Sequence, residues 1–169
     1  MKLQWAVLED WLKKNNPRLW TDLNPPATDE KIRDFQHKVG ISLPPDFITC
    51  LKRHDGQKGQ AEWLFSGYEF LSIDNILLTW LAWNDLLADG DFDDRLPKAN
   101  DGVENVWWSD AWIPFASNGG GKNLCLDMRP SRSGNVGQVI TVYHDFPDRT
   151  LIAADFSIWF ASFVDIRTT

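Results

Sequence analysis

Few side chains in this 169-residue chain have the types and the spacing that catalysis requires. The triplet His54-Asp55-Gly56 places an imidazole beside a carboxylate, as in a general base and the group that orients it. The same triplet suits a helix end, with a histidine near the negative pole and a glycine just beyond. Ser117, Asp55 and His144 could converge as a triad, but the Gly-x-Ser-x-Gly turn of hydrolases is absent. The helix-end interpretation is therefore favoured, and no catalytic residue is predicted.

Three consecutive glycines, Gly119 to Gly121, stand before Lys122 and raise the question of a phosphate-binding loop. A Walker loop would require glycine at position 116 and serine or threonine at position 123, where Ala116 and Asn123 stand. Consecutive glycines instead favour a positive φ or a close backbone approach. We expect them to form the tight connection of a β-hairpin, and no bound cofactor is predicted.

An acidic run, Asp89-Gly90-Asp91-Phe92-Asp93-Asp94, resembles the opening of a calcium loop. Its sixth position is Asp94 instead of glycine and its twelfth is Asn100 instead of glutamate, so a solvated or partner-facing acidic surface is favoured. No metal site is predicted, because the histidines and cysteines share no ligand spacing (His37, His54, His144, Cys50 and Cys125). Both cysteines lie in apolar segments and are expected to be buried free thiols.

Two adjacent tryptophans, Trp107 and Trp108, follow this acidic stretch and lie close to Asp101 and Glu104. On a strand their rings would point to opposite faces, so one ring is expected to be exposed. An exposed aromatic ring beside carboxylates suits an interface anchor. The predicted partner-binding surface therefore consists of Asp89, Asp91, Asp93, Asp94, Asp101, Glu104, Trp107 and Trp108.

The charge balance narrows the classes of partner. Lys and Arg number 17 against 24 Asp and Glu, which gives a net charge of -7 that repels phosphate backbones and anionic lipid. Direct nucleic-acid binding and membrane binding are therefore disfavoured. A hydrophobic content of 43% with ten tryptophans predicts one folded domain over residues 1–169. There is no apolar run of membrane-spanning length and no apolar signal segment, so a cytoplasmic location is expected.

Helical spacing dominates the first half of the chain. It predicts a helix from Leu3 that ends at residues 15–17, and a second helix between an N-cap at Thr28 and a C-terminal glycine, Gly40. Pro44 and Pro45 begin a third helix that is expected to end near residues 55–56. The longest helix of the middle is predicted from Asp74 to Gly90.

Strand signals follow. The turn residues Ser66-Gly67 between aromatic-rich segments predict a first hairpin over residues 63–71. Residues 89–105 are expected to form an exposed loop, and strands are expected to begin near Val106. Residues 112–143 predict a meander of strands, which a short strand at 151–153 and an amphipathic helix at 156–163 follow.

In this order the motifs resemble those of the SUKH superfamily. The first half carries Pro26-Ala27-Thr28, Gly40-x-x-Leu43-Pro44-x-Asp46-Phe47 and His54-Asp55-Gly56. The second half carries Trp112-x-Pro114-Phe115, the glycine turn, Leu124-Cys125-Leu126-Asp127 and Gly137-Gln138-Val139-Ile140. The resemblance covers about residues 24–163, and Lys122-Asn123 depart from it, since the family often has an acidic residue after the turn glycines. It implies an α+β fold, a mainly antiparallel sheet with helices packed around it, which the residue patterns also favour.

The resemblance implies a binding role rather than an enzyme, because the superfamily includes bacterial toxin-immunity proteins and fungal cell-wall synthesis regulators. The leading hypothesis is an immunity protein that occludes a cognate toxin domain, such as a basic nuclease attracted by the acidic charge. The alternative is a regulatory or scaffold module. Such regulators are expected to carry long low-complexity arms, whereas this chain begins its first helix near Leu3 and stops soon after Val164. An enzyme for small substrates would need a cleft with perturbed titrating groups.

Overall fold

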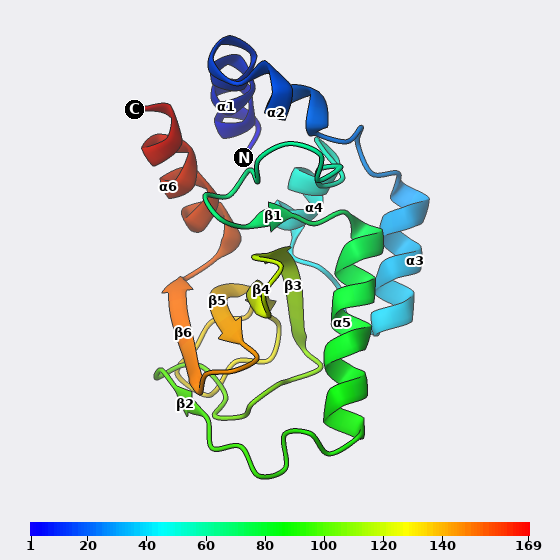
Figure 1. The fold of residues 1–169 in the computed structure, drawn as a ribbon, viewed down its shortest axis with the longest axis vertical. Coiled ribbons are helices and arrows are strands. Elements are labelled where there is room, and N and C mark those ends of the chain that lie inside the picture. Colours follow the sequence, from blue (N-terminus) through cyan, green and yellow to red (C-terminus); the bar gives the residue numbers. More distant parts are fainter.

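A six-stranded open sheet organises the computed structural model, which describes residues 1–169 (Figure 1). The strand order is β1-β3-β4-β5-β6-β2, and all neighbours are antiparallel except β2 and β6, which are parallel. The strands are β1 (Glu69–Phe70), β2 (Lys98–Ala99), β3 (Trp112–Ser117), β4 (Lys122–Asp127), β5 (Gln138–Tyr143) and β6 (Asp148–Ala153). The predicted α+β fold with a mainly antiparallel sheet is confirmed.

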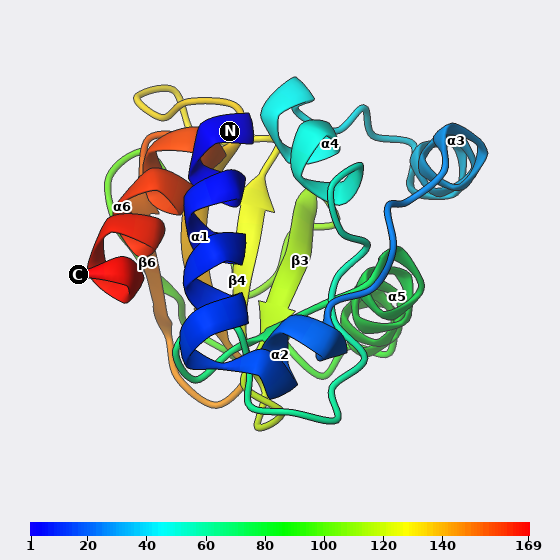
Figure 2. The ribbon, with the colours of Figure 1, turned by 90° about the horizontal axis from the view of Figure 1, so that it is seen from above.

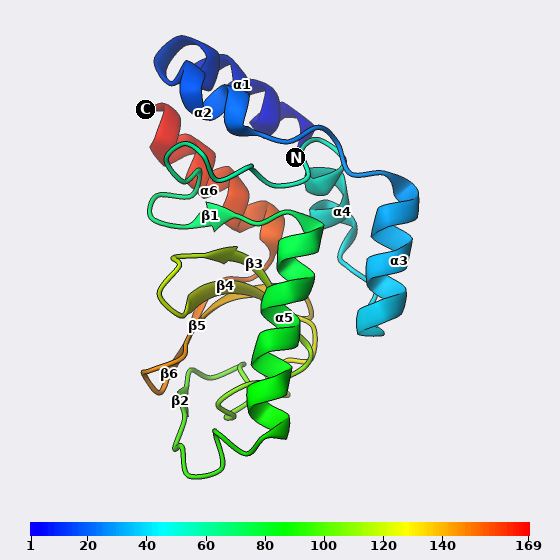
Figure 3. The ribbon, with the colours of Figure 1, turned by 45° about the vertical axis from the view of Figure 1, so that its right-hand side comes forward.

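Six helices surround this sheet. They are α1 (Lys2–Asn15), α2 (Pro17–Asp22), α3 (Asp29–Val39), α4 (Pro45–Leu51), α5 (Ile73–Ala88) and α6 (Phe156–Thr168). In Figure 2 helix α1 lies in front of the sheet and runs alongside β4, with α6 packed beside it on the side of β6. Figure 3 shows α1, α2, α4 and α6 above the sheet, whereas α5 runs down beside it and α3 lies on the outer side of α5. None of these helices has the length and apolarity needed to cross a membrane.

The alternation of side chains along the strands divides the core between the two faces of the sheet. Ile113, Phe115 and Leu124 point to the face covered by the helices and belong to a cluster of 28 buried residues. Trp112 and Cys125 point to the opposite face, where a second cluster of nine buried residues includes side chains from α5 and from the segment after it. Both faces are therefore covered.

The elements whose bounds were predicted correctly begin or end at capping and turn residues. Thr28 caps α3 by accepting a hydrogen bond from the Lys31 backbone nitrogen at 3.1 Å, and Gly40 ends the helix at φ +70°. The glycine turn also forms the expected hairpin connection between β3 and β4, with Gly119 and Gly121 at positive φ. Local signals thus fix these bounds correctly.

Several predicted bounds are wrong. Residues 63–71 do not form a hairpin: their turn is present at Ser66-Gly67, but only β1 is a strand, and it pairs with β3. The Leu64 backbone nitrogen donates to the side chain of Gln57 instead of to a partner strand. Strand β3 begins at residue 112 rather than near Val106, and α4 ends at Leu51, before residues 55–56.

Two short elements were not predicted. Helix α2 follows α1 directly, because Asn16 closes one helix and its side chain caps the next by accepting from the Leu19 nitrogen at 3.1 Å. Strand β2 lies inside the stretch expected to be an exposed loop, and Asn100 continues its contact with β6 by accepting from the Leu151 nitrogen. Both depend on contacts that helical or strand periodicity does not encode.

Candidate functional site

His54, the candidate general base, is bonded through both ring nitrogens. Its Nδ1 lies 2.8 Å from the Asn24 backbone oxygen and its Nε2 lies 3.0 Å from Glu9 Oε1. Its ring also packs on Trp5 with centroids 5.0 Å apart. Burial alone would raise the pKa of Glu9, but hydrogen bonds from Arg53 and His54 hold it below its ordinary value. The histidine is thus part of a buried polar network that joins α1 to the segment after α4.

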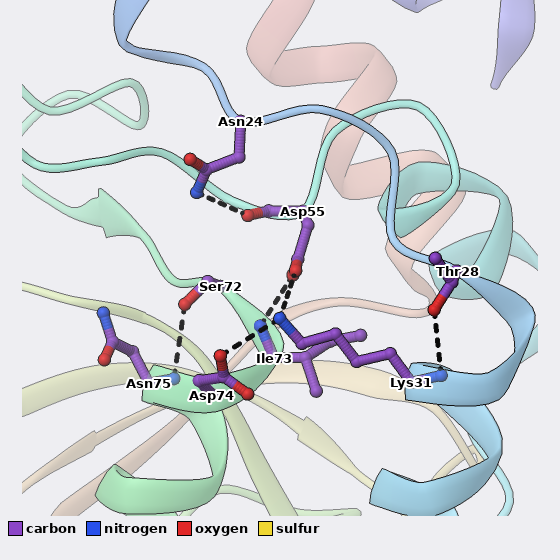
Figure 4. A network of polar contacts seen from close by, with 8 residues as sticks. All are labelled: Asn24, Thr28, Lys31, Asp55, Ser72, Ile73, Asp74 and Asn75. Atoms are coloured by element: carbon purple, nitrogen blue, oxygen red, sulfur yellow. Dashed lines mark hydrogen bonds and ion pairs between the residues drawn. The ribbon is translucent and has the colours of Figure 1, made fainter.

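Asp55 is the centre of a second network, which Figure 4 shows. Its Oδ1 accepts from the Ile73 backbone nitrogen at 2.7 Å, and its Oδ2 accepts from Lys31 Nζ at 2.9 Å. Lys31 also reaches Asp74 Oδ2 at 3.1 Å, and the Asn24 side chain donates to the Asp55 backbone oxygen at 2.8 Å. Burial alone would lower the pKa of Lys31, but its two carboxylate partners raise it. Asp55 therefore fastens α3 and the start of α5 to one loop.

Gly56 completes this corner of the fold. Its φ is +66°, and a Cβ atom placed on it would lie 2.3 Å from the Ser72 backbone nitrogen and 2.4 Å from the Leu71 carbonyl carbon. Only glycine fits there without moving the backbone that leads into α5. The triplet 54–56 joins elements of the fold, but the helix-end interpretation is wrong, because α4 already ends at Leu51.

The structure does not assemble the candidate triad. Ser117 and His144 line one groove, but the Ser117 hydroxyl accepts from the Gly119 nitrogen and His144 pairs with Asp145 at 3.0 Å. Asp55 belongs to the network at the start of α5. No group of three or more His, Cys, Asp or Glu side chains is arranged to hold a metal ion. Cys50 and Cys125 are buried free thiols, as expected.

The predicted acidic surface lies on the segment after α5. Asp89, Asp91, Asp93, Asp94 and Asp101 are exposed, and Glu104 is half-buried. Between these carboxylates, Phe92 is buried, and its ring lies 5.7 Å from that of Trp83 and 6.4 Å from that of Trp107. An apolar anchor thus holds the aspartates of residues 89–94 at the surface.

The expectation of an exposed tryptophan is wrong, because Trp107 and Trp108 are both buried. They lie in the irregular segment before β3 instead of on a strand, so the alternation of faces does not apply. Trp108 stacks on Trp83 at 4.7 Å, and its Nε1 donates to Asn84 at 2.8 Å. The two rings belong to the second core cluster, and neither presents an anchor to a partner.

Arg149 contributes to the burial of Trp107, because it contacts both the ring and the backbone oxygen of that residue. The guanidinium is fully buried 4.5 Å from the Trp107 ring, and it donates to the backbone oxygens of Trp107, Tyr143 and Phe146. Burial lowers the pKa of Arg149 to about 10. The charge is therefore satisfied by carbonyl groups and ties the β5–β6 turn to the segment before β3.

Two grooves at the surface were missed by sequence reasoning. The first, about 380 Å³, lies between α5 and the β3–β4 turn and is called the α5 groove here; its lining includes Leu78, Trp83 and His144. The second, about 640 Å³, lies beside α6 and is called the α6 groove; its lining includes Ile158, Phe163 and Ile166. The signal for the first was present in the sequence, since the leucines of α5 are spread around more of the helix than one buried face requires.

Comparisons with known proteins match nearly the whole chain. The profile of the SMI1/KNR4 family (SUKH-1) matches residues 26–162. The chain is 23% identical to the cell wall assembly regulator SMI1 of Saccharomyces cerevisiae, over 96% of this chain and 39% of that protein. It is 26% identical to the cell wall biosynthesis/cell cycle regulator smi1 of Schizosaccharomyces pombe, over 90% of this chain and 34% of that protein. It is also 20% identical to the glucan synthesis regulatory protein of Neurospora crassa, over 93% of this chain and 36% of that protein. The chain thus spans less than two fifths of the length of these relatives.

Proposed function

Because the chain belongs to the SMI1/KNR4 family (SUKH-1), we propose that it is a cytoplasmic regulatory domain that acts by binding a protein partner rather than by catalysis. One observation carries the proposal: the groups suited to catalysis are used to hold the fold together, while apolar side chains stay open at the surface. His54 and Asp55 each bond through both polar atoms of their side chains. Leu78, Ile158 and Ile166 are more than half exposed. Exposed apolar surface beside grooves is typical of protein-binding sites.

The names of the relatives indicate which process such a domain would regulate. Their names place them in the assembly of the cell wall and in glucan synthesis. We propose that this domain takes part in the control of cell-wall polysaccharide synthesis by holding a partner of that process. The proposal concerns the part of the relatives that this chain matches.

Partner capture tests the binding role. The domain is expressed with a proximity-labelling enzyme, and each captured protein is purified and titrated against the unlabelled domain by calorimetry. We expect at least one captured protein to form a saturable complex of fixed stoichiometry. If every purified candidate gives only non-saturable heats, the binding role is wrong.

A segment exchange tests the pathway. The matching segment of the Saccharomyces cerevisiae relative is replaced by this chain, and growth is scored on a dye that stresses the cell wall. Restored growth relative to a deletion of the segment supports the regulatory role. A chimera that is produced at normal levels but grows like the deletion counts against it.

Toxin immunity is a second candidate, and the family resemblance favours it less than regulation, because the relatives named above are regulators. The observation that favours it is the group of exposed aspartates at residues 89–94, which complements a basic toxin surface. Co-expression with a toxin encoded by a neighbouring gene would test it. If the chain is an immunity protein, co-expression should rescue growth, and the domain should associate with the toxin more slowly when Asp91, Asp93 and Asp94 are changed to asparagine. Toxicity that persists unchanged would exclude this function.

A further inference from the structure

One side of α5 carries apolar side chains that the rest of the chain leaves open. Leu78 is 64% exposed and Leu81 is 42% exposed, and Ala82 beside them is also exposed. Leu78, Ala82 and Leu86 recur every four residues, so they form one ridge of about 12 Å along the helix. A ridge of this kind is the surface against which another helix packs.

The ridge borders the α5 groove, whose floor is held rigidly. Trp83 lies in the lining, and its Nε1 donates to Asn123 Oδ1 at 3.0 Å while its ring stacks on Trp108 at 4.7 Å. Asn123 in turn donates to the Ala116 backbone oxygen at 3.1 Å. A floor fixed in this way loses little side-chain entropy when a ligand binds.

Exposed carboxylates lie on segments that pack next to one end of the groove. The ring of Phe92 lies 5.9 Å from that of His144, a lining residue, so the segment of residues 89–94, with its exposed aspartates, packs next to the groove. Asp85 is exposed on α5, and Asp145 is paired with His144. The lining itself contains neither lysine nor arginine. The groove therefore combines an apolar ridge with an acidic end.

We propose that the α5 groove binds an amphipathic helix of a partner protein, with apolar residues spaced by three and four and with Lys or Arg near one end. The inference rests on the proposed protein-binding function and names the site and the chemistry of the partner. A helix fits because the ridge of α5 can interdigitate with the ridge of a second helix. Long basic side chains of the partner reach the exposed carboxylates of residues 89–94. The α6 groove has Lys122 as its only charged lining residue, so it does not select a basic helix and serves as the control face.

A peptide titration tests this site. The probe is a fluorescent synthetic helix of about 15 residues, three to four turns, with leucines along one side and lysines at one end. A peptide of the same composition in scrambled order is its control. Binding to the full chain is measured by anisotropy, and the indole N–H resonance of Trp83 is followed by NMR. We expect saturable binding of the designed peptide only, a shift of that resonance and weaker binding at high salt.

Two variants and a matched control locate the binding. Leu78→Glu should weaken binding about tenfold or more, because it places a charge in the apolar contact. The combined change of Asp91, Asp93 and Asp94 to asparagine should weaken binding several-fold at low salt. Ile166→Glu, at a side chain that is 77% exposed on α6, should leave the affinity unchanged.

The outcomes separate this inference from the proposed function. Equal binding of the designed and scrambled peptides, or a loss with Ile166→Glu but not with Leu78→Glu, would overturn the α5 groove. A captured partner that still binds the Leu78→Glu variant at full strength would also overturn it, while the protein-binding function would stand. If the peptide binds at the groove but no captured protein forms a complex, the affinity of the groove for a basic amphipathic helix stands, while the proposed function fails.

Discussion

Substituting alanine for Gly56 is the sharpest test of the corner that joins α4 to α5. The chain offers a matched control in Gly40, because the two glycines have nearly the same positive φ, +66° at Gly56 and +70° at Gly40. A Cβ atom at Gly40 would have nothing within 4 Å, whereas one at Gly56 would lie 2.3 Å from the Ser72 nitrogen. The two substitutions therefore share the cost of the left-handed conformation and differ in the steric clash.

The magnitudes follow from this difference. Gly40→Ala should cost about 1 to 2 kcal/mol, the penalty of a left-handed L-residue. At Gly56 the backbone before α5 must shift, and the bond from the Ile73 nitrogen to Asp55, now 2.7 Å, would be lost with it. A hydrogen bond to a charged group contributes about 1.5 to 3 kcal/mol, so Gly56→Ala should cost about 3 to 5 kcal/mol.

Urea unfolding, monitored by tryptophan fluorescence, measures the loss of unfolding free energy in both variants. We expect the midpoint of the Gly56→Ala variant to lie well below that of Gly40→Ala, with similar slopes for the two. NMR of the Ile73 amide would show whether its bond to the carboxylate is lost. Equal losses of stability in the two variants would refute the steric argument, because the shared conformation would then account for the whole effect.

Three further predictions follow from the same contacts. Asp55→Asn should lower the free energy of unfolding by about 2 kcal/mol, measured by thermal or urea unfolding. Asp74→Asn removes a more exposed partner of the same lysine of α3 and should cost less than about 1 kcal/mol. Equal losses in the two variants would contradict the argument that burial strengthens the Asp55 contact. The pKa of Glu9 is lowered by folding, so its stabilisation is full above its ordinary value of 4.5 and is lost as the pH falls through the lower folded value. The free energy of unfolding of the Glu9→Gln variant should therefore fall less steeply below pH 4.5 than that of the unchanged protein. The same pH dependence in both proteins would count against a stabilising role for the Glu9 network. Cys50 and Cys125 are buried, and burial raises the pKa of their thiols. A thiol reagent should therefore modify them only when urea unfolds the protein. Rapid modification of the folded protein would show that the thiols are accessible.

The sequence predicts the parts of the fold that depend on neighbours along the chain. The cap at Thr28, the glycine at Gly40 and the glycines of the β3–β4 turn each act within a few residues, and the structure has them where they were expected. The three central strands could be recognised for the same reason, since the alternation of faces is a local pattern. Local chemistry thus fixes α3 and the meander.

The rest depends on contacts between distant residues. Trp107 is buried because Arg149, 42 positions later, binds its backbone oxygen, and no local pattern announces that bond. His54 is bonded to Glu9 from 45 positions earlier, so its environment could not be inferred from the triplet. The turn-rich composition after α5 predicts exposed aspartates there, and they are exposed, but it could not show that a groove lies near them. Helical spacing predicts α5, but it could not show which leucines of that helix stay exposed.

Hydrogen exchange of the domain with its captured partner tests the central claim most directly. The claim is that the domain binds a protein through the α5 groove, so amides of α5 from Leu78 onward and of residues 89–94 should exchange more slowly in the complex. Amides of α6 should exchange at the rate seen in the free domain. Protection confined to α6, or no protection anywhere at saturating partner, would contradict the account.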